Sequence, residues 1–441
     1  MVLRHADQIS MGNIKSRART FSVTSKPFVE NISKLNFFKS KTTYLTMDHT
    51  ENFKDSPFSP LLILFHFFGW IKLPCPESCR KREYFVYIWN SLRYLFYLVV
   101  IFTLAFKAVS VFLVSFSRTT LMTFIVLLFQ TSVFVRVFRY RRTIMLLQRK
   151  LWKIFKRLHY THRWKALKIS TCVCVLLQTC IPILLAALYL KSNMNYSARL
   201  ESKESPYILE GFKFYYLIIQ DIWSALHILL LYALSAYLTT YFYIVCTCLK
   251  VLYLELVTQF PVFIAKDDYQ TMIQVYQEIT EVMIYFQDFF SYPAFINVLS
   301  SMAGLFWGSY SIVFQSQKDY IISVFLLGVV LNYFALLLAI MMPASAVNKA
   351  AKVAKNTVLS TPGWFPQHYG KLKMFICKRF KHQELALTLG KVYKIDTSLI
   401  ISTLGTLISY GILVGTLGTV QKSSHNEIDM ANCSDLQFKN L

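Results

Sequence analysis

Charged residues are scarce in this 441-residue chain: Asp, Glu, Lys and Arg together make up 16%, against 55% hydrophobic residues. Water-soluble domains carry about a quarter charged residues, so this composition lacks the polar surface that a soluble fold needs. The nine cysteines are too sparse for a disulfide-stapled secreted scaffold. The 37 Phe and 27 Tyr are too many for a disordered chain. The sequence therefore predicts an integral membrane protein.

Enzyme and metal motifs are missing as well. The sequence contains no HExxH, no Walker A loop, no GxGxxG and no GxSxG. Cys75 and Cys79 form an isolated pair, and no second pair supplies the two further ligands that zinc needs. We therefore expect no enzyme, no bound metal and no cofactor.

Long apolar runs are what the chain does have. A helix that spans a bilayer needs about 20 mostly apolar residues, and seven stretches qualify: residues 94–114, 119–138, 169–190, 214–248, 289–314, 320–342 and 395–420. These predict an all-α polytopic membrane protein with seven transmembrane helices. The fourth stretch is about 50 Å long as a helix, and we expect it to continue as an amphipathic helix with a break near Pro261.

The spans divide the chain into segments with different expected roles. Residues 1–57 form a basic cytosolic tail, for which a mitochondrial presequence is the alternative, since no apolar signal-peptide core is visible. Residues 58–93 form an interfacial segment, in which 61–71 is too short to span. Helices one to six with their cytosolic extensions occupy 94–343, an anchor and linker 344–394, the seventh helix 395–420 and an extracellular tail 421–441.

The distribution of cations predicts the orientation. Of the 47 Lys and Arg, 36 fall on the side of the membrane that includes the N-terminus and 8 on the other side, which indicates a cytoplasmic N-terminus and an extracellular C-terminus. The glycosylation sequons at Asn195 and Asn432 fall on the expected outside, whereas Asn31 falls inside. This polarity disfavours a G-protein-coupled receptor. A secondary transporter is the other alternative, but it predicts internal repeats that the sequence does not show.

The C-terminal end carries a family resemblance. Residues 387–418 contain Gly390, Tyr393 and Asp396, followed by Ser409 and Tyr410 in the last apolar run. This arrangement resembles the C-terminal signature of arthropod gustatory receptors, in which Thr-Tyr and Gln-Phe stand where this chain has Ser409-Tyr410 and Thr416-Leu417.

The resemblance implies a chemosensory function. Receptors of that family are ligand-gated, non-selective cation channels of the plasma membrane of sensory neurons, opened by a small-molecule tastant. They assemble as homo- or hetero-tetramers of related receptors around a pore lined by the last helix. Their ligand pocket lies in the outer half of the spans.

The seventh stretch also has the pattern of a pore helix. At 100° per residue, its hydroxyl side chains fall on one face together with Leu413, a candidate constriction that could close the pore by dewetting. The predicted pore-lining residues are Ser398, Ser402, Thr406, Ser409, Leu413 and Thr416. The alternative is that the small residues of this helix only allow close helix packing.

Polar and aromatic residues within the spans are candidates for a ligand pocket. Lys107 and Asp221 lie at equal depth below the outer ends of spans one and four, which permits an ion pair or a shared pocket. Snorkelling of Lys107 to the interface and simple packing of the aromatic residues are the alternatives. The other candidates are Gln220, Trp223, Gln130, Trp307, Tyr310 and Asn332.

The stretch from Arg139 to Lys168 contains eleven cations and no acidic residue. It could bind anionic lipid or calmodulin, or it could be a solvated helix that only sets the topology. Nucleic acid is not expected as a partner, because the cations follow the loops rather than a compact domain.

Overall fold

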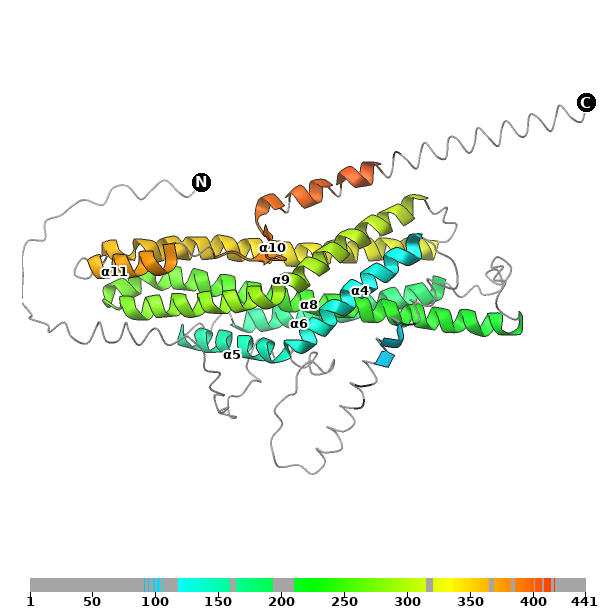
Figure 1. The fold of residues 1–441 in the computed structure, drawn as a ribbon, viewed down its shortest axis with the longest axis horizontal. Helices are drawn as coiled ribbons and strands as arrows, with labels where there is room; N and C mark the ends of the chain where they lie inside the picture. Colours follow the sequence, from blue (N-terminus) through cyan, green and yellow to red (C-terminus); the bar gives the residue numbers. More distant parts are fainter. Residues whose placement is uncertain are drawn as a thin grey trace, which may run out of the picture. The chain divides into compact units, whose positions relative to one another are not determined.

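The computed structural model describes residues 91, 94, 98–99, 101–103, 105, 118–158, 164–192, 210–314, 320–364, 369–381, 385–399, 401–406, 408–413 and 416. The chain divides into two units, Met1–Glu51 and Asn52–Leu441, and all of these residues belong to the second. They are helical apart from turns and two very short strands (Figure 1). The all-α prediction is confirmed.

Three helices are much longer than a membrane is thick. They are α8 (Glu210–Ala265), α9 (Tyr269–Phe314) and α10 (Tyr320–Trp364). At 1.5 Å per residue, α8 is about 84 Å long and each of the others close to 70 Å, against a hydrocarbon core of about 30 Å. Each helix therefore has one part that lies outside the bilayer.

The other helices are shorter and pack around these three. They are α4 (Arg118–Arg139), α5 (Arg141–Arg157), α6 (Trp164–Ser192) and α11 (Tyr369–Ile376), the last followed by a π-helical turn at Cys377–Lys381. The helices α4 and α5 are separated only by Tyr140, at φ −96° and ψ 14°. The described residues between 91 and 105 are also helical.

Aromatic packing between α8 and α9 forms the centre of the core. Tyr241 stacks on Phe290 with ring centroids 5.1 Å apart, and Phe242 lies 5.3 Å from Phe286. Further along, Tyr253 donates a hydrogen bond to the sulfur of Met283 at 3.4 Å. Residue numbers rise on one helix as they fall on the other, so the two helices run antiparallel.

Four described helices are long and apolar enough to cross a membrane. Their apolar segments are Ala166–Ser192, Ser235–Ala265, Tyr269–Ile312 and Tyr320–Trp364, and two shorter apolar helices run over Phe124–Val137 and Thr397–Leu413. Six of the predicted spans therefore coincide with apolar helices, and the few described residues of the first span are helical. The segment 61–71 and the sequons at Asn31, Asn195 and Asn432 lie outside the described residues.

The expected break near Pro261 lies elsewhere. Pro261 sits inside α8 near its C-terminal end, where the missing N–H removes a single helical hydrogen bond. The chain turns after Ala265 instead, with Asp267 at φ 54°. The Asp268 carboxylate accepts a hydrogen bond from the backbone N–H of Thr271 at 3.1 Å, which caps the start of α9.

Candidate functional site

A small hairpin precedes the last helix. Strands β1 (Thr388–Leu389) and β2 (Tyr393–Lys394) pair antiparallel, and the Val392 N–H donates to the Leu389 carbonyl at 3.0 Å. The turn requires φ values of 60° at Gly390 and 64° at Lys391, a region that glycine adopts without cost. The signature glycine therefore has a local conformational reason.

Asn348 of α10 holds both ends of this hairpin. Its side-chain nitrogen donates to the carbonyls of Leu387 at 3.2 Å and Ile395 at 2.6 Å. Its side-chain oxygen accepts from the N–H of Leu387 at 2.7 Å. All of these groups are buried, where an unpaired peptide group is costly. A carboxamide suits this position because it carries both donors and an acceptor.

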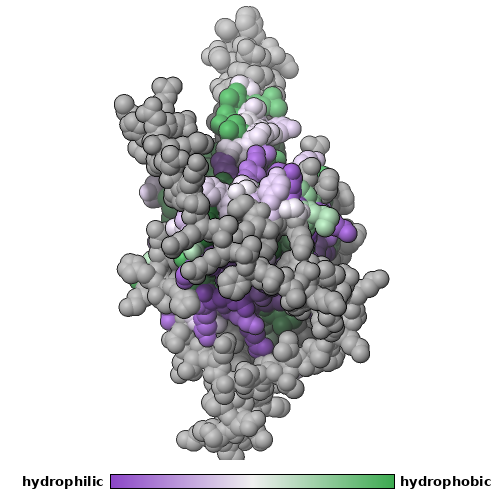
Figure 2. Space-filling view, turned by 90° about the vertical axis from the view of Figure 1, so that its left-hand side faces the viewer, coloured by the Kyte–Doolittle hydropathy of each residue, from purple (hydrophilic) through white to green (hydrophobic). Residues whose placement is uncertain are grey.

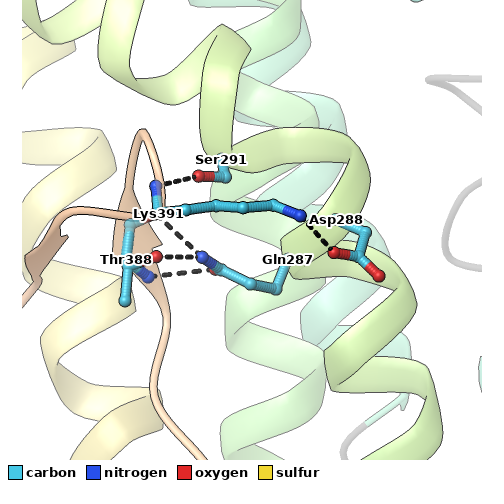
Figure 3. Close-up of polar contacts among 5 residues, drawn as sticks. All are labelled: Gln287, Asp288, Ser291, Thr388 and Lys391. Carbon is cyan, nitrogen blue, oxygen red and sulfur yellow. Dashed lines mark hydrogen bonds and ion pairs between the residues drawn. The ribbon is translucent and has the colours of Figure 1, made fainter.

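Helix α9 holds the turn from the other side (Figure 3). The Gln287 carboxamide accepts from the N–H of Thr388 at 3.0 Å and donates to its carbonyl at 3.1 Å, and it also contacts the Thr388 hydroxyl. Ser291 accepts from the N–H of Lys391 at 2.7 Å through its hydroxyl and from the N–H of Gly390 at 3.1 Å through its carbonyl. We call Gln287, Ser291 and Asn348 the hairpin clamp.

An ion pair lies at the edge of the clamp. The Lys391 ammonium is 2.8 Å from the Asp288 carboxylate, and the two side chains are 63% and 60% exposed. Exposed pairs of this kind contribute about 0–1 kcal/mol. The amide and hydroxyl contacts, rather than this ion pair, hold the hairpin in place.

The last helix starts directly from the clamped hairpin. The Asp396 carboxylate accepts from the N–H of Leu399 at 2.8 Å, so the signature aspartate is an N-cap. The hydroxyls of Ser345 on α10 and Thr397 lie 3.5 Å apart. Because its first turn is fixed to the hairpin and to α10, any movement of this helix is linked to those elements.

The predicted pore-lining side chains are all exposed in the single chain: Ser398, Ser402, Thr406, Ser409, Leu413 and Thr416. Several hydroxyls bond to carbonyls of their own helix, for example Thr406 to Ser402 and Ser409 to Gly405, both at 2.9 Å. Leu413 is 52% exposed. Apolar residues on other faces are exposed as well, including Ile401, Ile408 and Ile412, so exposure by itself does not single out one face.

The remaining signature tyrosines differ in their surroundings. Tyr393 lies on the exposed β2 strand. Tyr410 is also exposed, but its ring centroid lies 6.4 Å from that of Phe306 on α9. Thr403 is buried and donates to the carbonyl of Leu399 at 2.7 Å. Thr403 and Tyr410 therefore lie on the face of the last helix that meets the rest of the chain.

Of the predicted pocket residues on α8, two have described side chains. Asp221 is 1% exposed, and the Trp223 ring meets Phe102 edge-on with centroids 4.8 Å apart. The side chain of Gln220 and all of Lys107 lie outside the described residues. The proposed pairing of Lys107 with Asp221 therefore stays a prediction.

The other predicted pocket residues separate into two groups. Gln130 is buried and its side-chain oxygen accepts from the Ser235 hydroxyl at 2.8 Å, and Asn332 on α10 is buried too. Trp307 and Tyr310 on α9 are 38% and 43% exposed. Trp307 lies three residues after Gly304 and Tyr310 two residues after Gly308, and both glycines are buried. The exposure of these two aromatic residues contrasts with the burial of Asn332, and their role in a pocket stays a prediction.

Sequence reasoning missed several buried polar groups inside the spans. The rings of Tyr232 on α8 and Tyr333 on α10 lie 5.2 Å apart. Among the described residues of the spans, buried atoms without a hydrogen-bond partner include Thr239 Oγ1, Asn297 Oδ1 and Ser300 Oγ. Nδ2 of Asn332, a residue that the sequence did single out, is another. The signal for Asn297 and Ser300 was their position inside an uninterrupted apolar run. Gln287, Ser291 and Asn348 gave no such signal, because they lie where the predicted spans end.

Comparison with known proteins identifies a family and a similar fold. The model of the 7tm chemosensory receptor family matches residues 58–414. The chain is similar to the insect olfactory receptor OR5 from Machilis hrabei, with a TM-score of 0.64 and 11% identity over 81% of this chain and 97% of that one. The complex of that receptor with eugenol gives a TM-score of 0.63 and 11% identity over 82% and 97%. Comparison with curated protein sequences gives no match.

Proposed function

The chain belongs to the 7tm chemosensory receptor family, and we propose that it is a gustatory receptor that acts as a ligand-gated, non-selective cation channel. The C-terminal signature residues Gly390, Tyr393 and Asp396 support the gustatory assignment. The structure of the similar olfactory receptor contains eugenol, a small organic molecule. We propose a small-molecule tastant as the ligand of this chain as well, and the plasma membrane of sensory neurons as its location.

The observation that carries the proposal is the combination of the hairpin clamp with an exposed last helix. A helix that leaves so many apolar side chains uncovered needs lipid or further protein around it, and hydroxyls on one face suit a hydrated path. We propose that four copies, identical or of related receptors, surround a central pore with this helix. Its polar stripe would face the ions, and the other faces would meet lipid and neighbouring subunits.

Gating would work through the linkage described above. A ligand shifts an equilibrium only by its different affinity for the two states. Binding among the buried polar groups of α4, α8 and α10 would favour a helix arrangement in which the clamped hairpin carries the last helix outward. The ring of Leu413 side chains would then widen and admit water.

Substitution at the proposed constriction tests the function. Leu413→Ser, expressed in a heterologous cell line, should raise basal calcium entry because a polar ring no longer excludes water. Ile412→Ser is the matched control, since Ile412 is also exposed but lies about 100° around the helix. Calcium imaging of these cells during exposure to a panel of tastants identifies the ligand. Equal basal entry in the two variants and the native chain would remove Leu413 as the gate.

A further inference from the structure

A cation without an ion pair to any described residue lies near the end of α4. Arg136 places its guanidinium carbon 4.8 Å from the centroid of the Tyr292 ring and 5.7 Å from that of Tyr140. Its Nε atom is buried, and no described residue pairs with it. Arg139 is exposed three residues later, on the same side of the helix. Arginine stays positively charged in proteins because it does not lose its proton. Within the described chain, this charge has no counter-charge.

Contacts with α9 show where this site lies along the bundle. Ser132 and Tyr292 share a hydrogen bond of 2.8 Å between their hydroxyls, and the rings of Tyr140 and Phe289 are 5.6 Å apart. From Phe289 to Phe314, α9 has no charged residue, whereas acidic residues precede it. The boundary between hydrocarbon and water therefore lies near Tyr140, and Arg136 sits within one turn of it.

The following helix leaves the membrane. Lys150 lies 4.4 Å from the ring of Tyr285, and Arg157 pairs with Glu278 at 2.6 Å, so α5 follows α9 toward its polar beginning. Figure 2 looks at this end of the molecule and shows hydrophilic side chains among its coloured residues. The start of the basic stretch from Arg139 to Lys168 is therefore at the level of the lipid headgroups.

We propose that Arg136 and Arg139 bind the phosphate group of an anionic phospholipid. Guanidinium forms short, paired hydrogen bonds with phosphate oxygens, and a lipid headgroup is held at the depth of this site by the bilayer itself. Tyr140 and Tyr292 provide the aromatic surface that is common at membrane interfaces. The site requires only that the chain spans the membrane, and it is independent of the proposed channel function. The proposed orientation makes the leaflet the cytosolic one.

A lipid bound at this site would affect the hairpin clamp. Tyr292 follows Ser291 directly, and Ser291 accepts two hydrogen bonds from the turn of the hairpin. A phosphate that draws Arg136 away from the Tyr292 ring, or holds it there, acts on the same turn of α9. The lipid site is therefore placed to influence the start of the last helix.

Lipid retention by the purified full-length chain tests the site. The protein is reconstituted in phosphatidylcholine vesicles with and without phosphatidylserine, re-extracted, and the co-purified lipid is measured by mass spectrometry. Arg136→Gln should lower phosphatidylserine retention about fivefold, the loss expected for one cation, and Arg136→Lys should restore part of it. Lys153→Gln is the matched control, because Lys153 is exposed on α5 beyond the headgroup level.

Each alternative has its own result. Equal losses in Arg136→Gln and Lys153→Gln would indicate non-specific attraction and overturn the site. Displacement of the lipid by inorganic phosphate at matched ionic strength would show a site for free anions instead. Unchanged retention in a variant that keeps the native unfolding temperature would show that Arg136 only packs on the tyrosine rings. None of these measurements depends on a tastant or on a current.

Discussion

Asn348 bonds to three buried peptide groups with one side chain, and it thereby joins α10 to both ends of the hairpin. Two of these groups belong to Leu387 and one to Ile395, the residues on either side of the paired strands. Leaving a buried peptide group unpaired costs about 1–3 kcal/mol. Asn348 therefore fixes the geometry of the linker more firmly than the exposed pair of Lys391 and Asp288.

Asn348→Ala should lower the free energy of unfolding by about 2–4 kcal/mol, because the Leu387 N–H and the Ile395 carbonyl lose the partner that Asn348 provides. The Leu387 carbonyl keeps its hydrogen bond from the Ile395 N–H. The substitution should also uncouple the last helix, so that ligand no longer changes the current. Thermal unfolding in detergent and whole-cell recording check the two effects. Asn356→Ala is the control on the same helix, where the asparagine is exposed. If both variants unfold at the native temperature, the hairpin is held by other contacts.

Asp221 is an acidic residue buried within a span, which marks it as a functional position by default. Asp221→Ala should weaken the response to ligand by about tenfold, the value of one charged hydrogen bond, without loss of surface expression. Asp221→Asn keeps the shape and tests the charge alone. Dose–response curves from calcium imaging, together with surface biotinylation, provide the measurement. An unaltered half-maximal concentration in both variants would place the ligand elsewhere.

At the scale of elements, the apolar runs were sufficient to place the spans. The predicted fifth stretch ends at residue 314 and the sixth begins at residue 320, as do α9 and α10. Long apolar segments are easy to locate because the bilayer imposes both length and composition. The prediction failed at Pro261, where a helix breaker falls in the last turns and removes only one bond.

The candidate site was harder to predict than the spans. The signature residues Gly390 and Asp396 were located, and their roles as turn and N-cap follow from local chemistry. The clamp residues were not, because Gln287 and Asn348 lie 101 and 39 residues from their hairpin partners. Pairing at that distance depends on how α9 and α10 pack, which a single sequence does not show.

The packing of α9 against α10 depends on glycines spaced four residues apart. A Cβ atom at Gly304 would collide with the Tyr333 ring, and one at Gly308 would lie 2.6 Å from Val330 Cγ2. Such small residues let helices approach closely in membranes. Tyr333 in turn contacts Tyr232 on α8. The absence of a side chain at Gly304 therefore also affects the position of this tyrosine pair.

Gly304→Ala should therefore destabilise the bundle by about 1–3 kcal/mol, the usual cost of overpacking, and displace Tyr333 from Tyr232. The double variant Gly304→Ala with Tyr333→Leu should recover stability, since it removes the colliding ring. Gly363→Ala on α10 is the control, because nothing lies within 4 Å of its added atom. Unfolding temperatures of these variants and of Tyr333→Leu alone form the comparison, and simple addition of the two single effects in the double variant would argue against a direct collision.

At the scale of the whole molecule, the proposed orientation rests on the distribution of charge. The side assigned to the cytosol holds 36 of the 47 cations, and loops rich in Lys and Arg stay inside. An N-terminal epitope tag should thus be stained only after cells are permeabilised. Glycosidase treatment should shift the mass of the native chain, and Asn195→Gln with Asn432→Gln should abolish that shift. Staining of intact cells, or carbohydrate at Asn31, would reverse the orientation.

The hairpin clamp binds main-chain atoms of the hairpin. Gln287 also contacts the Thr388 hydroxyl. Docking of that kind does not depend on which side chains the hairpin carries. Mutation can accordingly change exposed positions outside the signature, such as Val392 and Lys394, while the attachment persists. Related receptors can therefore differ in sequence at these exposed positions. A hairpin from a distant relative, introduced into this chain, should still dock between α9 and α10.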